Sequence, residues 1–275
     1  MEWKNEVILI TGVTSGLGEQ LALKGAELGA TLILVARNQD GLQRLLATVR
    51  DRGVAAYGFC FDLHQYEKIP ELYQEIKATV GNTPTVLINN AGYNAAGFII
   101  NTPAKVYEDN YRTNVFAPIA LMQSVLPDML QKQKGYVVNI MSAAMHHAFP
   151  GISSYCSSKV ALGSIHESLQ TELSGTSVHS LYVNPGSFRS EYFKNTRVDG
   201  RFKNYRYQSK ADHLRKDPRI VAEAIFKALS EGKSHMDLSS YMDKIGHHLN
   251  YWAPRVLDWL LVTRNTDILR DRPYA

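Results

Sequence analysis

The sequence predicts an α/β protein with one doubly wound parallel sheet and helices on both of its faces. Short apolar runs rich in β-branched residues, such as those at 7–11 and 31–36, alternate with longer stretches of helical periodicity, such as 39–52. Glycines or small polar residues follow several of these runs, where the chain would turn from strand to helix. The 275 residues, 45% of them hydrophobic, can fill one large core, and no repeat or linker divides them. We therefore expect a single domain over residues 1–275.

Composition and charge argue against several classes of protein. The net charge of +4 is mild, and no basic run interleaves with stacking aromatics, so we expect no nucleic-acid binding. Cys60 and Cys156 are the only cysteines, which suits a reducing compartment and not a disulfide framework. No apolar run reaches the length of about eighteen residues that a spanning helix needs. These features together predict a cytoplasmic protein.

The first strand is expected at Val7–Thr11, and a glycine-rich turn follows it directly. The glycines stand at G-x-x-x-G-x-G spacing and lead into a helical pattern that Gly29 ends. A strand, a glycine turn and a helix N-terminus can cradle a diphosphate, because the backbone approaches closely and free N–H groups point at the ligand. The alternative is a tight turn without a ligand. The predicted cofactor-binding residues of this turn are Gly12, Thr14, Ser15, Gly16, Leu17 and Gly18.

The end of the second strand, Thr31–Ala36, bears on which dinucleotide would bind. An NAD site usually has an Asp or Glu here for the ribose 2′-hydroxyl, but no carboxylate occurs before Asp40. Arg37 can instead pair with a 2′-phosphate, and Ser15 in the glycine turn can donate to it. The sequence therefore favours NADP over NAD. The alternative is that Arg37 ends a strand and faces water.

An acidic residue follows the third strand, which is expected at 54–59. Asp62, with Leu63 beside it, lies just past the carboxyl end of this strand, where doubly wound sheets bind ligands. Asp62 can accept a hydrogen bond from an adenine amino group. It can equally serve as the N-cap of a helical segment at 66–80.

The fourth strand, at 85–88, ends in two asparagines followed by small residues. Asn90, Ala91 and Gly92 would let a flat cofactor pack against backbone, whereas Asn89 is expected to tie neighbouring strand ends together. Helices are expected at 103–112 and at 114–133. Asn114 lies in this helical pattern, where asparagine is a poor helix former.

The fifth strand and the helix after it hold the candidate reactive groups. The strand is expected at 136–141, and Ser142 ends it. Tyr155 and Lys159 are four residues apart on a helix that runs to about Ser174, so their side chains lie on one face. A tyrosine titrates near ~10, and a cation one turn away lowers that pKa, so Tyr155 can exchange a proton with a carbonyl or alcohol oxygen. The alternative is an ordinary solvated tyrosine–lysine pair.

Taken together, these motifs resemble the short-chain dehydrogenase/reductase family. After a sixth strand at 177–183, the chain continues with Pro185 and Gly186. The order and spacing of the family are matched by T-G-x-x-x-G-x-G at 11–18, N-N-A-G at 89–92, Ser142, Y-x-x-x-K at 155–159 and Pro185–Gly186. The resemblance covers about residues 5–230.

This resemblance implies a Rossmann fold with about seven parallel strands and a nicotinamide cofactor. It implies that Tyr155 is the acid/base, that Ser142 orients the carbonyl, that Lys159 holds the nicotinamide ribose, and that Asn114 holds a water that relays protons. It further implies that Pro185 and Gly186 contact the cofactor. Where the family usually has a threonine, Ser190 is the expected substitute. A homodimer or homotetramer is also implied.

Residues 188–216 are expected to form a lid over the substrate. Between 194 and 216 the chain has eight Lys or Arg, opposed only by Asp199 and Asp212, with aromatic residues interleaved. This composition favours an acyl or lipid-like ketone that bears an anionic group. The alternative is a solvated loop. His146 and His147, next to the candidate site, are expected to line the pocket, and no metal site is expected.

Residues 241–264 are expected to form an amphipathic C-terminal extension. Leu249, Trp252, Val256 and Leu260 recur at helical spacing, with Trp259 beside them. One interpretation is a helix lying on a membrane surface with tryptophans at headgroup depth. The other is docking onto a sibling subunit or over the pocket mouth.

The sequence thus predicts an NADP-dependent oxidoreductase that transfers a hydride between nicotinamide and a carbonyl or alcohol substrate, apolar or lipid-like in character. Two alternatives remain at this point. One is a steroid- or sphingoid-type ketone reductase at a membrane surface. The other is a cofactor-sensing scaffold that has the fold without the chemistry.

Overall fold

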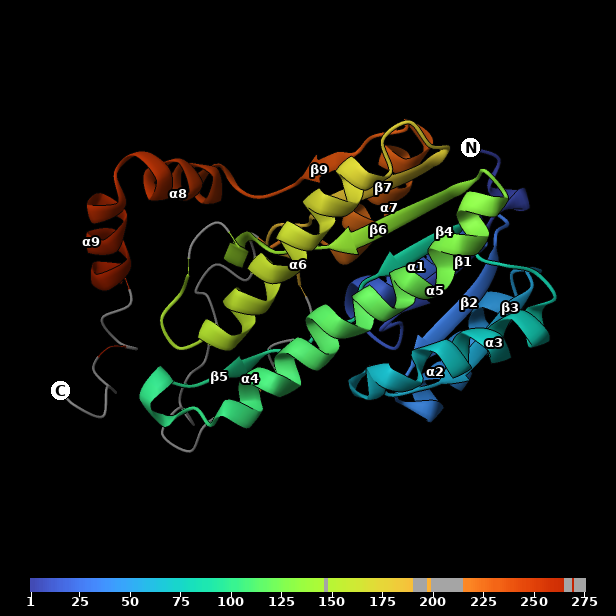
Figure 1. The fold of residues 1–275 in the computed structure, drawn as a ribbon, viewed down its shortest axis with the longest axis horizontal. Helices are drawn as coiled ribbons and strands as arrows, with labels where there is room; N and C mark the ends of the chain where they lie inside the picture. Colours follow the sequence, from blue (N-terminus) through green and yellow to red (C-terminus); the bar gives the residue numbers. More distant parts are fainter. Residues whose placement is uncertain (146–147, 190–196, 199–214, 265–268, 270–275) are drawn as a thin grey trace.

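A computed structural model of the chain describes residues 1–145, 148–189, 197–198, 215–264 and 269. Its centre is a seven-stranded parallel sheet in the order β3-β2-β1-β4-β6-β7-β9, with helices on both faces (Figure 1). The predicted doubly wound α/β fold is therefore confirmed. The strands are β1 Val7–Thr11, β2 Thr31–Ala36, β3 Ala56–Cys60, β4 Val86–Asn89, β6 Gly135–Ile140, β7 Val178–Asn184 and β9 His235–Asp237. A second, two-stranded parallel sheet pairs β5, Ala95–Ala96, with β8, Arg197–Val198.

The helices form two layers, one on each face of the main sheet. One layer, α1, α2 and α7, shares a hydrophobic core with one face, and the other, α3, α5 and α6, shares a core with the opposite face. The bounds are α1 Gly16–Glu27, α2 Gln39–Arg50, α3 Ile69–Val80, α4 Ala104–Tyr111, α5 Ala117–Gln131, α6 Ser153–Glu172, α7 Pro218–Ser230, α8 Tyr241–Trp252 and α9 Pro254–Arg264. Short turns of helix occur at η1 Trp3–Asn5, η2 Leu63–Lys68, η3 Ile99–Asn101, η4 Arg112–Phe116 and η5 Ala143–Met145.

The central position of strand β1 explains why its apolar residues do not alternate with polar ones. It lies between β2 and β4 at the middle of the sheet, and all five of its residues are buried. Ile8 and Ile10 belong to one core, and Val7 and Leu9 belong to the other, as successive side chains of a strand point to opposite faces. Helices cover both faces, so both sets of side chains must be apolar.

A buried carboxylate links the N-terminal ends of three central strands of the sheet. One oxygen of Glu6 accepts a hydrogen bond of 2.6 Å from the Thr85 hydroxyl, and the other lies 2.7 Å from the Lys134 ammonium. The Thr85 hydroxyl oxygen in turn accepts a bond of 3.0 Å from the Val7 N–H. These contacts join the beginnings of β1, β4 and β6 at the end of the sheet opposite the carboxyl ends of the strands.

Several element boundaries differ from the prediction. The helices expected at 103–112 and 114–133 are one continuous rod, in which η4 is a π-helical turn between α4 and α5. Strand β3 begins two residues later than expected, and β9 was not among the strands expected from residue patterns. The C-terminal stripe is divided between two helices, because α8 ends at Trp252 and Pro254 begins α9.

Candidate active site

A cavity of about 740 Å³ opens at the carboxyl ends of the central strands. It brings together predicted site residues from widely separated parts of the chain. Those that line it are Gly12, Thr14, Ser15, Gly16, Leu17, Gly18, Arg37, Asp62, Leu63, Asn90, Ala91, Gly92, Ser142, Tyr155, Lys159, Pro185 and Gly186. The predicted residue Asn114 does not itself line the cavity. Ser190, His146, His147 and most of the expected lid lie outside the described residues.

At two glycine positions, the turn at one end of the cavity has no room for a side chain. Gly12 has a φ of +71°, and a Cβ there would lie 2.8 Å from the Cα of Ala91. A Cβ on Gly18 would lie 2.1 Å from the carbonyl oxygen of Gly12. The amide of Asn90 fixes the turn by donating to the carbonyl oxygens of Thr11 and Gly12, at 2.9 and 3.2 Å.

The N-terminus of α1 faces this cavity without a side-chain cap. Its N-cap residue, Ser15, makes no capping hydrogen bond, and Gly16 and Leu17 of the first turn line the cavity. Uncapped N–H groups and the positive end of the helix dipole suit an anion. The residues present therefore fit the diphosphate of a dinucleotide.

Arg37 and Asp62 lie at the part of the cavity nearest the ends of β2 and β3. The Arg37 side chain is exposed, and no carboxylate of the described residues is paired with it. Asp62 accepts a hydrogen bond of 3.0 Å from the His64 N–H and so caps η2. The capping interpretation of Asp62 is confirmed, although the capped helix is η2 and not α3. Since Asp62 also lines the cavity, both predicted roles remain available to it.

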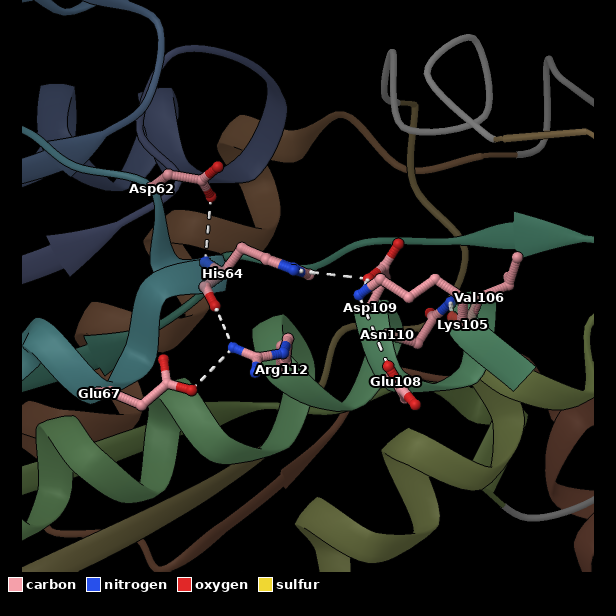
Figure 2. Close-up of polar contacts among 9 residues, drawn as sticks. All are labelled: Asp62, His64, Glu67, Lys105, Val106, Glu108, Asp109, Asn110 and Arg112. Atoms are coloured by element: carbon pink, nitrogen blue, oxygen red, sulfur yellow. Dashed lines mark hydrogen bonds and ion pairs between the residues drawn. The ribbon is translucent and has the colours of Figure 1, made fainter. Parts of the chain in front are cut away.

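The wall beside Asp62 is held to α4 and η4 by polar contacts that the sequence did not reveal (Figure 2). The His64 ring lies 3.4 Å from a carboxylate oxygen of Asp109, and the Lys105 ammonium lies 2.6 Å from the same oxygen. Arg112 donates to the backbone carbonyl of His64 at 3.1 Å and to Glu67 at 2.9 Å. Both His64 and Asp109 line the cavity, so these contacts set the position of its wall.

Tyr155, Lys159 and Ser142 line the other part of the cavity. Tyr155 and Lys159 are one turn apart on α6, and Ser142 lies two residues past the end of β6. The Lys159 side chain is only 4% exposed, and its ammonium donates to the carbonyl of Ile140 at 2.9 Å. Burial lowers the pKa of Lys159 from 10.5 to about 8, because the charged form loses its hydration. The Ser142 hydroxyl oxygen accepts a bond of 3.2 Å from the Ala144 N–H.

Asn114 lies in the π-helical turn η4 and is 1% exposed. Its amide closes a pair of hydrogen bonds with the backbone of Tyr93, each 2.8 Å long, and Tyr93 lines the cavity. The same amide nitrogen donates to the Ser158 hydroxyl at 3.0 Å. Turns of π-helix are often found at functional sites, where the extra residue redirects side chains. The expected placement of Asn114 in a regular helix is thus corrected by a π turn that no residue pattern predicted.

A seam of buried polar groups joins α4 and η4 to the helix that holds Tyr155. The Asn110 amide donates to the Ser154 hydroxyl at 3.3 Å, and Asn114 bonds Ser158 one turn further on. The Ser158 hydroxyl donates in turn to the backbone carbonyl of Tyr155 at 2.7 Å. Asn110 and Ser158 are completely buried, so each of these bonds replaces lost hydration. The spacing of four residues on both helices was the signal that could have revealed this seam.

Behind β4 and β6, Asn89 has the structural role that the sequence predicted. Its amide donates to the Asn139 side chain at 2.8 Å, and Asn139 lies 3.0 Å from the ring of His166 on α6. Burial lowers the pKa of His166 to about 4, so this ring is neutral at physiological pH. The chain of amides thus joins two strands to α6 without a buried charge.

The comparisons with known proteins identify the family. The family model described as short chain dehydrogenase matches residues 6–200. The chain is 32% identical over 268 residues to the dehydrogenase/reductase SDR family member 7B of Bos taurus, covering 95% of this chain and 82% of that protein. It is 32% identical over 193 residues to the estradiol 17-beta-dehydrogenase 11 of Mus musculus, covering 69% of this chain and 64% of that protein. The chain belongs to the short-chain dehydrogenase family and is an oxidoreductase of that class.

Solved structures support the same fold. A short-chain dehydrogenase from Streptomyces avermitilis superposes with a TM-score of 0.78 at 29% identity, over 95% of this chain and 98% of the other. Two more distant structures are a metagenomic short-chain oxidoreductase in complex with NADP and a Burkholderia phymatum short-chain dehydrogenase/reductase in complex with NAD. Their TM-scores are 0.71 and 0.76, at 23% and 24% identity. The first covers 85% of this chain and 96% of its own, the second 99% and 97%.

Two kinds of feature are absent from the described residues. Among them, no helix is both long and apolar enough to cross a membrane. In the same part of the chain, no three His, Cys, Asp or Glu side chains gather in a way that could hold a metal ion.

Proposed function

We propose that the protein is an NADP-dependent oxidoreductase that interconverts a carbonyl and an alcohol in an apolar or lipid-like substrate. The observation that carries this proposal is the shared cavity. One part of it has an uncapped helix N-terminus and an arginine, and the other has Tyr155, Lys159 and Ser142. A dinucleotide bound along this cavity would bring its nicotinamide to the tyrosine.

In this proposal each side chain has a distinct task. Tyr155 gives a proton to the carbonyl oxygen during reduction and takes it back during oxidation, and the Ser142 hydroxyl donates a hydrogen bond to the same oxygen. Lys159, when protonated, stabilises the phenolate of Tyr155 from one helical turn away. The bound nicotinamide supplies or accepts the hydride. Asn114 acts indirectly, because its amide positions Tyr93 and Ser158 through hydrogen bonds.

The preference for NADP rests on Arg37. Its exposed guanidinium at the end of β2 has no acidic partner among the described residues and can make charge-assisted bonds to a 2′-phosphate. Ser15 lines the same cavity as Arg37. Related structures are known with NADP and with NAD, so family membership by itself does not decide between the two.

The proposed substrate class rests on the lining near Tyr155. Phe149 and Ile152 supply apolar surface in a cluster with Tyr155, and Phe188 and Arg215 add an apolar ring and a cation to the lining of the same cavity. This combination suits a ketone with an apolar body and an anionic group. Arg197 and Lys216 of the predicted basic lid are also described, and its other basic residues lie outside the described residues. One relative is named as an estradiol 17-beta-dehydrogenase, which favours a steroid-type ketone or alcohol as the second candidate.

The cofactor preference is tested by titrating the purified protein with NADPH and NADH and following nicotinamide fluorescence. NADPH should bind more tightly than NADH. The Arg37→Ala variant should weaken NADPH binding by about 10- to 100-fold, the range for a charged hydrogen bond, and leave NADH binding unchanged. Arg44→Ala, on the exposed side of α2, is the matched control. Equal weakening of both nucleotides by Arg37→Ala would contradict the 2′-phosphate assignment.

Catalysis is tested with a panel of apolar ketones and alcohols that includes steroids and acyl compounds with an anionic group. Turnover that is lost in Tyr155→Phe while NADPH binding is kept would support the proposed chemistry. Binding of NADPH without turnover of any panel member, unchanged in Tyr155→Phe, would favour the cofactor-sensing scaffold. We also propose a cytoplasmic homodimer or homotetramer, which light scattering and cell fractionation would test.

A further inference from the structure

The two C-terminal helices present aromatic side chains to solvent. Tyr241, Tyr251 and Trp252 on α8 are 77–80% exposed, and Trp259 on α9 is 64% exposed. Figure 1 shows α8 and α9 projecting beyond the end of the sheet, with α9 turned across the end of α8. No described residue of α8 or α9 belongs to either of the two cores of the fold.

The apolar contacts of these helices do not account for the exposed rings. Leu257 is buried, and Leu249 and Leu260 are half-buried, in contrast to the exposed aromatic residues. Val256, Trp259 and Val262 lie on the opposite side of α9 and are exposed. Tyr251 and Trp252 contact one another edge to face, with ring centres 5.1 Å apart.

The exposed face of α8 combines its aromatic rings with basic side chains. Tyr241, Lys244, His248, Tyr251 and Trp252 follow one another at helical spacing, and all five are exposed. The single carboxylate of α8, Asp243, lies off this face, where it lines the cavity and caps the helix with Ser240. On α9, Arg255 and Asp258 are both exposed and offset one another.

We propose that the exposed aromatic residues Tyr241, Tyr251 and Trp252 of α8 and Trp259 of α9, together with Lys244, form an aromatic face that binds the surface of an anionic lipid bilayer. Tryptophan and tyrosine favour the boundary between headgroups and acyl chains, because each has an apolar ring and a polar atom. Lys244 is placed among them to meet anionic headgroups.

A second copy of the chain fits this face less well. A two-fold contact across this face would bury the Lys244 ammonium groups of both copies in one interface. Like charges brought together and dehydrated oppose such a contact, whereas lipid phosphates and carboxylates neutralise them.

The position of the face gives membrane binding a consequence for the substrate. Asp243, in the first turn of α8, lines the same cavity as Tyr155. The face therefore shares helix α8 with part of the cavity lining, and a bound bilayer would lie close to the cavity that takes up an apolar substrate. This last point rests on the proposed function, whereas binding to lipid does not.

The test is sedimentation of the full chain with vesicles, without cofactor or substrate. Phosphatidylcholine vesicles that contain phosphatidylserine should sediment the protein better than phosphatidylcholine alone. The double variant Trp252→Gln/Trp259→Gln should lower the partition coefficient by at least about tenfold, and Lys244→Gln by about fivefold, as expected for one cation near an anionic surface. The matched control, Ile220→Gln/Leu130→Gln, changes two exposed apolar residues on α7 and α5 and should bind as the wild type does.

Fluorescence provides a second readout, because the chain has three tryptophans and Trp3 is buried. Brominated lipids should quench the wild type but not the double variant, in which only Trp3 remains. Three results would overturn the proposal: no sedimentation of the wild type, equal sedimentation of the double variant, or a lipid-free oligomer that the double variant dissociates in light scattering. The last result would assign the face to a subunit contact. Because none of these readouts needs turnover, they separate a failure here from a failure of the proposed catalysis.

Discussion

Replacing Lys159 by methionine is expected to raise the stability of the folded chain at neutral pH. The ammonium is almost fully buried, and burial lowers its pKa from 10.5 to about 8. In the unfolded chain the lysine recovers its ordinary pKa, so between pH 8 and 10.5 the unfolded state binds more protons than the folded state. Stability therefore rises with pH across this window, and the penalty for the buried charge is fully present below pH 8.

The size of this penalty follows from the shift. At about 1.4 kcal/mol per pKa unit, the charged lysine costs the folded state about 3 kcal/mol at pH 7. The same two pKa values leave about 1 kcal/mol of it at pH 10. Methionine has a similar length and no charge, but it forfeits the bond to the Ile140 carbonyl, which is worth about 1–2 kcal/mol. Lys159→Met should thus be more stable than wild type by about 1–2 kcal/mol at pH 7. The difference should shift by about 2 kcal/mol by pH 10, where the variant should be as stable as wild type or less stable by up to about 1 kcal/mol.

Urea unfolding followed by circular dichroism at pH 7, 8.5 and 10 measures this difference. Wild type and variant are compared at equal protein concentration and without nucleotide, since ligands and association both change apparent stability. Lys227→Met, whose side chain is 76% exposed, is the control and should change little at any pH. A stability difference between Lys159→Met and wild type that stays constant from pH 7 to pH 10 would refute the reasoning.

Three further predictions concern the polar seam, the glycine turn and the edge of the sheet. Asn110→Ala should cost about 1–3 kcal/mol in unfolding free energy, because it leaves the Ser154 hydroxyl unpaired, and should lower kcat with little change in NADPH affinity. Unchanged kcat would show that the seam only stabilises the fold. Gly18→Ala should abolish nucleotide binding in calorimetry, since its Cβ would collide with a backbone oxygen at 2.1 Å. Glu6→Ala should lower the thermal midpoint more than Lys134→Met does, because Glu6 is buried whereas Lys134 is half exposed; the reverse order would contradict this account of the edge.

The parallel sheet and its order of elements could be predicted because the physical signal is local. Val7–Thr11 is buried at every position because it lies between two layers of helices, and Gly12 and Gly18 after it stand where a Cβ would collide with backbone atoms. Tyr155 and Lys159 were found for a similar reason, as a spacing of four residues on a helix needs no tertiary information.

The parts that could not be predicted depend on contacts between distant segments. The π turn around Asn114 has no sequence signature of its own, because it exists only where α4 packs on one neighbour and α5 on another. His64 and Asp109 are 45 residues apart, and each reads as an ordinary polar surface residue until the fold brings them within 3.4 Å. The burial of Lys159, and hence its lowered pKa, likewise appears only when β6 and α6 are placed together.

The π turn has a consequence for how this molecule tolerates change in length. Its extra residue shifts the phase of the rod by about 100° between α4 and α5. The side of α4 that holds Asn110 consequently faces α6, whereas the side of α5 that holds Leu121 and Val125 faces the sheet. Deleting one residue between 112 and 116 would give an unbroken α-helix with acceptable local geometry. It would also rotate one of these faces by about 100°, away from the surface on which it packs. We therefore expect a one-residue deletion here to rotate one half of the rod relative to the other.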